Sequence, residues 1–163
     1  MIVIVMGVSG SGKTMVGNSL ANRLEWRFYE GDDFHSQESI KKMASGVPLT
    51  DDDRVPWLKR LRDVMGECRN AGADAVIACS ALRQSYRSYL TEGASDVRIV
   101  YLKGDYGAIR ERIIRRHGHF MKDILLESQF SVLEEPTDAI VAYVSEEPQA
   151  IITKVVGELF PNG

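Results

Sequence analysis

Three glycines, a lysine and a threonine near the start of the chain have the spacing of a phosphate-binding loop. The pattern G-x-x-x-x-G-K-[ST] is filled by Gly7, Val8, Ser9, Gly10, Ser11, Gly12, Lys13 and Thr14. Glycine allows backbone angles that other residues avoid, so main-chain N–H groups can turn together toward an anion. The Lys13 ammonium could neutralise terminal phosphates, and the Thr14 hydroxyl could bind Mg²⁺. These residue types predict a site for a nucleoside triphosphate with Mg²⁺.

The elements on either side of this loop favour a binding site over a glycine-rich turn that binds nothing. Residues 2–6 form an unbroken apolar run, which is typical of a buried strand. After the loop, Val16, Leu20 and Leu24 recur at helical spacing. A helix that begins near Lys13 would direct its free N–H groups and the positive end of its dipole at bound phosphates.

The rest of the chain alternates strand patterns with helix patterns. Apolar runs predict five strands, at residues 2–6, about 27–30, 74–79, 97–102 and 139–144. This alternation predicts an α/β fold in which helices cover both faces of a parallel sheet. The 163 residues suit one domain, residues 1–163, with no internal repeat or linker. Ligands of such sheets bind at the carboxyl ends of the strands, so the residues that follow each strand are site candidates.

Composition and charge exclude several classes of partner. The apolar fraction of 44% and charged fraction of 26% are typical of a soluble globular protein. With a net charge of −3 and no apolar run long enough to span a bilayer, we expect neither nucleic acid nor a membrane as partner. Cys68 and Cys79 lack metal-ligand spacing, so we interpret them as buried thiols of a cytoplasmic protein. The sequence leaves open whether the chain is a monomer or a homodimer.

A carboxylate after the second predicted strand could serve the acceptor of a phosphoryl group. Asp32 could orient a hydroxyl group and take its proton, or it could hold a water molecule on Mg²⁺. The alternative is that Asp32 and Asp33 only cap a helix that begins near Ser36. His35 is a weaker candidate, because a lone histidine is often structural.

Two arginines could bind an acidic substrate. Arg54 follows a run of three aspartates, so it could form a surface ion pair or could grip a substrate carboxylate with two hydrogen bonds. Its spacing leaves both interpretations open. Ser80 and Arg83 follow the third predicted strand and would face the same crevice as Asp32. The alternative for Arg83 is a solvated arginine in the first turn of a helix.

An arginine-rich helix follows the fourth predicted strand. It carries Arg110, Arg112, Arg115 and Arg116 and runs into Gly118. Basic residues at a helix end ordinarily interact with the helix dipole. The glycine suggests instead a hinged lid, whose arginines would neutralise the transferring phosphoryl group and exclude water.

Taken together, the motifs resemble those of the gluconokinase family, small P-loop kinases related to shikimate and adenylate kinases. In chain order after the phosphate loop they are Gly31-Asp32-Asp33-Phe34-His35, Lys42-Met43, Gly46, Pro48-Leu49, Asp51, Asp53-Arg54, Pro56-Trp57-Leu58, Cys79-Ser80-Ala81-Leu82-Arg83, Tyr86-Arg87, Tyr101-Leu102-Lys103-Gly104, Arg112, Arg116, Gly118-His119-Phe120, Leu125-Leu126, Ser128-Gln129-Phe130, Leu133-Glu134 and Pro136. The resemblance implies a three-layer α/β/α P-loop kinase with a five-stranded parallel sheet and a helical lid at about residues 117–135. It also implies ATP- and Mg²⁺-dependent phosphorylation of D-gluconate to 6-phospho-D-gluconate.

The resemblance assigns roles to individual residues. Lys13, Asp32 and Arg116 would be catalytic, with Thr14 and Asp32 at the metal. Arg112 would join the phosphate loop in binding ATP, and the loop before Pro148 would lie against the adenine. Gluconate would contact Asp32, and further candidates for its binding site are His35, Lys42, Arg54, Arg83 and His119.

Four positions depart from the family pattern and bear on substrate preference. They are Glu30, usually Asp; Ser36, usually Pro; Ser39, usually Asn; and Thr50, often Asn. A kinase of shikimate or another small hydroxy acid therefore remains an alternative. A regulator that binds ATP without turnover is a second alternative, although such a protein needs neither Asp32 nor lid arginines.

Overall fold

Five parallel strands form the central layer of the protein, in the order β2-β3-β1-β4-β5. The computed structural model describes residues 1–117 and 122–161. The strands are β1 (Ile2–Met6), β2 (Arg27–Glu30), β3 (Ala75–Ala78), β4 (Val97–Lys103) and β5 (Ile140–Tyr143). All five strands predicted from the sequence are confirmed, with ends that differ by at most one residue.

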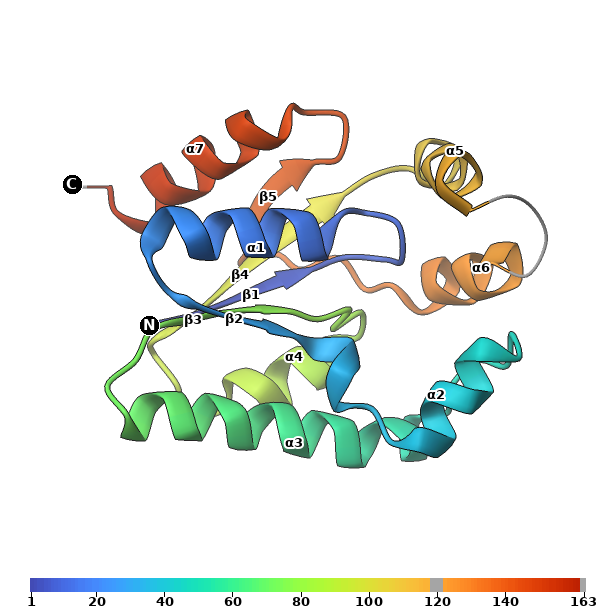
Figure 1. Cartoon of the computed structure of the whole chain (residues 1–163), viewed down its shortest axis with the longest axis horizontal. Coiled ribbons are helices and arrows are strands. Elements are labelled where there is room, and N and C mark those ends of the chain that lie inside the picture. The colour runs from blue at the N-terminus through green and yellow to red at the C-terminus, as the bar shows by residue number, and fades with distance from the viewer. Residues whose placement is uncertain (118–121, 162–163) are drawn as a thin grey trace.

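Helices cover both faces of this sheet (Figure 1). Helices α1 (Lys13–Leu24) and α7 (Pro148–Leu159) lie on one face, and α3 (Asp51–Asn70) and α4 (Gln84–Thr91) lie on the other. This arrangement confirms the predicted three-layer α/β/α fold. No helix within the described residues is long and apolar enough to span a membrane.

The remaining helices gather near the carboxyl ends of the strands (Figure 1). They are the short 3-10 helix η1 (Gly31–Phe34), α2 (Gln37–Ala44), α5 (Tyr106–His117) and α6 (Lys122–Val132). Helix α6 and the end of α5 fall within the segment predicted to form a lid. The sheet therefore presents its carboxyl edge to these peripheral elements.

Strand β1 lies at the centre of two apolar clusters, one on each face of the sheet. Val3 and Val5 pack with residues of α1 and α7. Ile2, Ile4 and Met6 pack on the other side with residues of α3 and α4. Because each face of β1 is covered, the strand is apolar at every position instead of alternating with polar residues.

Thr50, one of the departures from the family pattern, caps helix α3. Its hydroxyl oxygen accepts a hydrogen bond from the Asp53 N–H, and the Asp53 carboxylate accepts one from the Thr50 N–H at 2.9 Å. The two contacts form a capping box that satisfies N–H groups at the helix start. Threonine therefore preserves the start of α3.

The two cysteines are buried thiols, as predicted, and neither is in a disulfide. Cys79 follows β3, and burial raises the pKa of its thiol to about 12. A thiol with that pKa is neutral at pH 7 and is a poor nucleophile. This agrees with phosphoryl transfer that needs no covalent intermediate on the protein.

Candidate active site

The loop between β1 and α1 favours glycine at three positions, because Gly7, Gly10 and Gly12 all have positive φ. Gly10 has φ +83°, and a Cβ atom there would lie 2.6 Å from Ile113 of α5. Gly7 has φ +152°, and a Cβ atom there would lie 2.7 Å from the Ser11 hydroxyl oxygen. Helix α1 then begins with no side-chain cap, so its first N–H groups remain available to an anion. The loop has the form of a phosphate cradle.

Lys13 directs its ammonium group back into this loop. Its Nζ donates a hydrogen bond to the Val8 carbonyl oxygen at 3.1 Å. Burial lowers the pKa of Lys13, while the charges of Asp32 and Glu30 act in the opposite direction. The ammonium therefore lies close to the loop and to the carboxylates of Glu30, the last residue of β2, and Asp32, just after it.

Two pockets meet beside Lys13. The larger, of about 560 Å³, follows the phosphate loop and the start of α1 and reaches Thr14, Glu30 and Asp32. The smaller, of about 200 Å³, lies between η1, α2, α3 and α6. Ser9, Lys13 and Asp32 line both pockets. A phosphate in the larger pocket and a hydroxyl group in the smaller one would therefore meet at these three residues.

The larger pocket contains oxygen ligands that suit Mg²⁺. The Thr14 hydroxyl donates to the Glu30 carboxylate at 2.5 Å, and Asp32 lines the same pocket. Within the described residues, no group of three or more His, Cys, Asp or Glu side chains could hold a metal ion. The chain fits Mg²⁺ nonetheless, because this ion typically takes one or two carboxylates and completes its shell with water and substrate phosphates.

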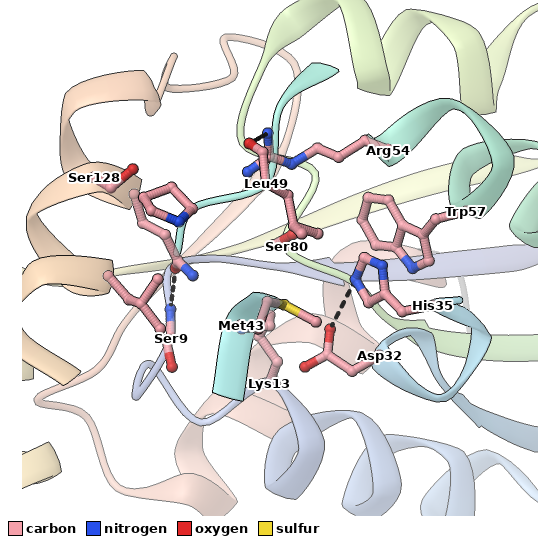
Figure 2. Close-up of a pocket in the computed structure, with 13 residues that line it drawn as sticks. Ser9, Lys13, Asp32, His35, Met43, Leu49, Arg54, Trp57, Ser80 and Ser128 are labelled. Carbon is pink, nitrogen blue, oxygen red and sulfur yellow. Dashed lines mark hydrogen bonds and ion pairs between the residues drawn. The ribbon is translucent and has the colours of Figure 1, made fainter. Parts of the chain in front are cut away.

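The smaller pocket has an aromatic wall made by His35 and Trp57 (Figure 2). The two rings are stacked, with centroids 4.5 Å apart and planes inclined by 11°. The Trp57 indole N–H donates to the Gly31 carbonyl oxygen at 2.7 Å, which ties α3 to the segment that carries Asp32. Burial lowers the pKa of His35, so the imidazole is neutral at pH 7. Its Nε2 lies 4.0 Å from the Asp32 carboxylate.

Arg54 lies at the other end of this pocket from Lys13 and Asp32 in the view of Figure 2. Its guanidinium donates to the Leu49 carbonyl oxygen and lies 5.8 Å from the centre of the Tyr86 ring. Asp51 is 3.9 Å from it, so the ion pair considered from the sequence exists. Since Arg54 also lines the pocket, the second interpretation, a contact with a substrate carboxylate, stays a prediction.

Two other predicted substrate contacts, Arg83 and Lys42, form ion pairs with aspartates of α3. The Arg83 guanidinium binds the Asp51 carboxylate at 3.2 Å, and Lys42 binds Asp53 at 2.7 Å. Neither Arg83 nor Lys42 lines the smaller pocket. Their roles in binding substrate remain predictions.

The predicted lid residues are only partly described. Ile109 and Ile113 of α5 pack against Gly10, which brings this helix to the phosphate loop. Arg112 lies on the same helix, half-buried. Position 116 is one turn beyond Arg112, but the Arg116 side chain and all of His119 lie outside the described residues. Pro148 is the first residue of α7 and lines neither pocket.

Several pocket residues were not assigned a role from the sequence. They are Met43, Pro48, Leu49, Trp57, Leu125, Ser128 and Gln129. Trp57 fits the apolar stripe of α3, so its pattern predicted only a core residue. Ser128 and Gln129 belong to a family motif, but nothing in their spacing indicates that α6 reaches the loop. The contact that shows this is a hydrogen bond of 2.6 Å from the Ser9 N–H to the Gln129 side-chain oxygen.

Comparisons with known proteins agree with this geometry. A family model described as an AAA domain matches residues 2–136. The thermoresistant gluconokinase of Escherichia coli K12 is 40% identical over 159 residues, which cover 95% of this chain and 91% of that protein. The chain belongs to the gluconokinase family. The gluconokinase of Gluconobacter oxydans is 43% identical, with 98% of this chain and 84% of that protein covered.

Solved structures extend the likeness to the whole gluconokinase fold. A gluconokinase from Sinorhizobium meliloti 1021 has a TM-score of 0.86 at 39% identity, covering 98% of this chain and 91% of that one. A shikimate kinase from Aquifex aeolicus has a TM-score of 0.65 at 16% identity, covering 99% of this chain and 98% of that one, a likeness of fold alone. The similarity to these solved structures thus also confirms the predicted P-loop kinase fold.

Proposed function

We propose that this protein transfers the γ-phosphoryl group of ATP to D-gluconate and releases 6-phospho-D-gluconate and ADP. The observation that carries the proposal is the meeting of the two pockets at Ser9, Lys13 and Asp32. The relatives from Escherichia coli and Gluconobacter oxydans, both gluconokinases, support gluconate as the acceptor. The chain acts as a single kinase domain, with residues of about 117–135 as its lid.

In this proposal the larger pocket holds the triphosphate of ATP. The N–H groups of the loop and the start of α1 bind phosphate oxygens, and Lys13 adds its positive charge. Thr14, Glu30 and Asp32 would hold Mg²⁺, directly or through water. When bound, the ion supplies charge neutralisation on the terminal phosphates.

The smaller pocket holds gluconate in an extended orientation. Its terminal hydroxyl group lies at Asp32, and its carboxylate lies toward Arg54 at the far end. The hydroxyl oxygen forms a bond to the γ-phosphorus as the bond from that phosphorus to the bridging oxygen of ADP breaks. Asp32 orients the hydroxyl group and accepts its proton. Arg116 would add positive charge as the lid closes, and Arg112 would bind the phosphates.

His35 and Trp57 determine the position of Asp32 in this arrangement. The Trp57 indole holds Gly31 in place, and the neutral His35 lies beside the carboxylate. The hydroxyl-rich chain of gluconate can pack along the ring of His35 and donate to polar groups around it. Arg83, Lys42 and His119 are further candidates for contact with gluconate, and the loop before Pro148 for contact with adenine.

A coupled assay of ADP release, run across a panel of acceptors, tests the proposal. We expect MgATP-dependent turnover with D-gluconate that exceeds turnover with shikimate and with other polyol acids. Mass spectrometry should find the added phosphate on the terminal carbon of gluconate. Preference for another hydroxy acid would identify a different kinase. ATP binding without turnover on any acceptor would favour a regulator.

A further inference from the structure

Helix α6 contributes a side chain to the point where the two pockets meet. The Gln129 side-chain oxygen accepts a hydrogen bond from the Ser9 N–H at 2.6 Å (dashed line at Ser9 in Figure 2). Leu125, Ser128 and Gln129 also line the smaller pocket. Since Ser9 lines both pockets, this contact brings a lid helix into the phosphate loop itself.

The hydrogen bond determines which way the Gln129 amide points. An N–H group can donate only to the amide oxygen, so the oxygen end must face Ser9. The NH₂ end, which carries two donors, therefore faces away from the loop backbone. Within residues 1–117 and 122–161 this NH₂ group makes no hydrogen bond to the protein, and it is not one of the buried unpaired polar atoms, so it is open to solvent and to a ligand in the pocket.

Two free donors in this place suit the oxygen atoms of a reacting pair. The terminal phosphate carries negative charge on its outer oxygens during transfer, and gluconate presents hydroxyl oxygens beside it. Lys13 and Asp32 line the same junction as a cation and an acceptor. Neither provides a neutral donor, and because the Ser9 N–H is occupied by the Gln129 oxygen, the Ser9 hydroxyl is the other neutral side-chain donor among the residues that line both pockets.

We propose that Gln129 is a catalytic residue that donates its NH₂ group to a substrate oxygen at the junction, while Ser9 holds its carbonyl oxygen in place. The inference rests on the proposed function, because it assumes that phosphate and acceptor meet there. It goes beyond that function by giving α6 a direct part in the reaction. The acceptor of the hydrogen bond is either a γ-phosphate oxygen or a gluconate hydroxyl group.

Two substitutions at position 129 test the donor. Gln129→Glu keeps an oxygen for the Ser9 N–H but loses both donors. Gln129→Met loses the donors without adding charge. We expect each to lower kcat by about 10²-fold, the loss typical when a donor to developing negative charge is removed. Melting temperature and ADP affinity should stay close to wild type. Glu127→Gln on the same helix is the matched control, since residue 127 is exposed and lines neither pocket. It exchanges the same two residue types as Gln129→Glu, in the reverse direction.

Binding measurements on the same variants identify the acceptor oxygen. A weaker affinity for a non-hydrolysable ATP analogue at unchanged ADP affinity indicates the γ-phosphate. A raised KM for gluconate alone indicates the hydroxyl group. If either variant keeps kcat within about threefold of wild type, or if kcat falls only together with melting temperature and ADP affinity, Gln129 is a structural link and the proposal is wrong. Wild-type turnover of gluconate, measured in the same assay, separates that outcome from failure of the proposed function.

Discussion

The imidazole of His35 lies flat on the indole of Trp57, with ring centroids 4.5 Å apart. The stack buries His35, and burial lowers the pKa of the imidazole, with the charge of Arg54 acting in the same direction and that of Asp32 against it. Trp57 in turn donates to the Gly31 carbonyl oxygen. The pair thus joins helix α3 to the segment that carries the proposed acceptor-side carboxylate.

His35 should make the stability of the fold depend on pH. Because its pKa is lower in the folded than in the unfolded chain, the unfolded chain binds a proton more readily. The free energy of unfolding is therefore expected to fall as pH drops below about 6.5, the ordinary histidine pKa. His35→Phe keeps a ring on Trp57 but cannot titrate, so the free energy of unfolding of this variant should change less between pH 7.5 and pH 5 than that of the wild type. Urea unfolding at both pH values measures this, and parallel curves for the two proteins would contradict it.

Lys13 and Asp32 should be needed for turnover but not for folding. Lys13→Ala removes the positive charge beside the phosphates, and Asp32→Asn removes the proton acceptor while keeping the shape of the side chain. We expect each to lower kcat by at least about 10²-fold, in the range typical of removed acid–base or charge-stabilising groups. The coupled assay with saturating MgATP and gluconate measures kcat, and circular dichroism checks the fold. Near-normal turnover in either variant would refute the role of that residue.

The structure ranks the two arginines proposed to bind the gluconate carboxylate. Arg54 lines the smaller pocket, whereas Arg83 does not and binds Asp51 instead. We expect Arg54→Lys to raise the KM for gluconate by about tenfold, since lysine cannot form the paired hydrogen bonds of a guanidinium group. Arg83→Lys should change this KM by less, and the KM for ATP should be unaffected in both. A larger effect of Arg83→Lys would mean that Arg83 moves into the pocket when gluconate binds.

Local patterns were sufficient to predict the sheet and the phosphate loop. Strand β1 is apolar at each position because helices cover both its faces, and Gly7 and Gly10 are required where a Cβ atom would collide with Ser11 or Ile113. Such constraints act on one element or on a few neighbouring residues, so they can be predicted from a short stretch of the sequence.

The walls of the acceptor pocket depend on contacts between distant segments. Gln129 accepts a hydrogen bond from Ser9, which lies 120 positions earlier in the chain. No local sequence pattern around either residue indicates this contact. Trp57 matches the apolar stripe of α3, so its helix pattern cannot separate a pocket wall from the core. Arg83 follows a strand at the carboxyl edge as predicted, yet the position of Asp51 decides where its guanidinium lies.

A buried arginine holds the loop between β3 and α4, which carries Ser80 into the acceptor pocket. Arg87 is 2% exposed. Its guanidinium donates to the carbonyl oxygens of Ala81 and Leu82, each at 3.0 Å, and to the Gln84 side-chain oxygen at 2.7 Å. Ala81 has φ +42°, an angle that a residue with a side chain rarely adopts without support. The arginine supplies that support.

Replacing Arg87 should therefore destabilise the fold strongly. Arg87→Met fills a similar volume but leaves the Ala81 carbonyl oxygen without its donor, whereas the Leu82 carbonyl oxygen keeps the hydrogen bond from the Glu134 N–H at 2.9 Å. A buried unsatisfied group costs about 1–3 kcal/mol. We expect the free energy of unfolding, measured with urea at pH 7, to fall by about 1–3 kcal/mol. Arg60→Met, which removes an exposed ion pair with Glu67, is the control and should cost less than about 1 kcal/mol. If the two variants lose similar stability, solvent can satisfy the Ala81 carbonyl oxygen, and Arg87 does not determine the position of Ser80.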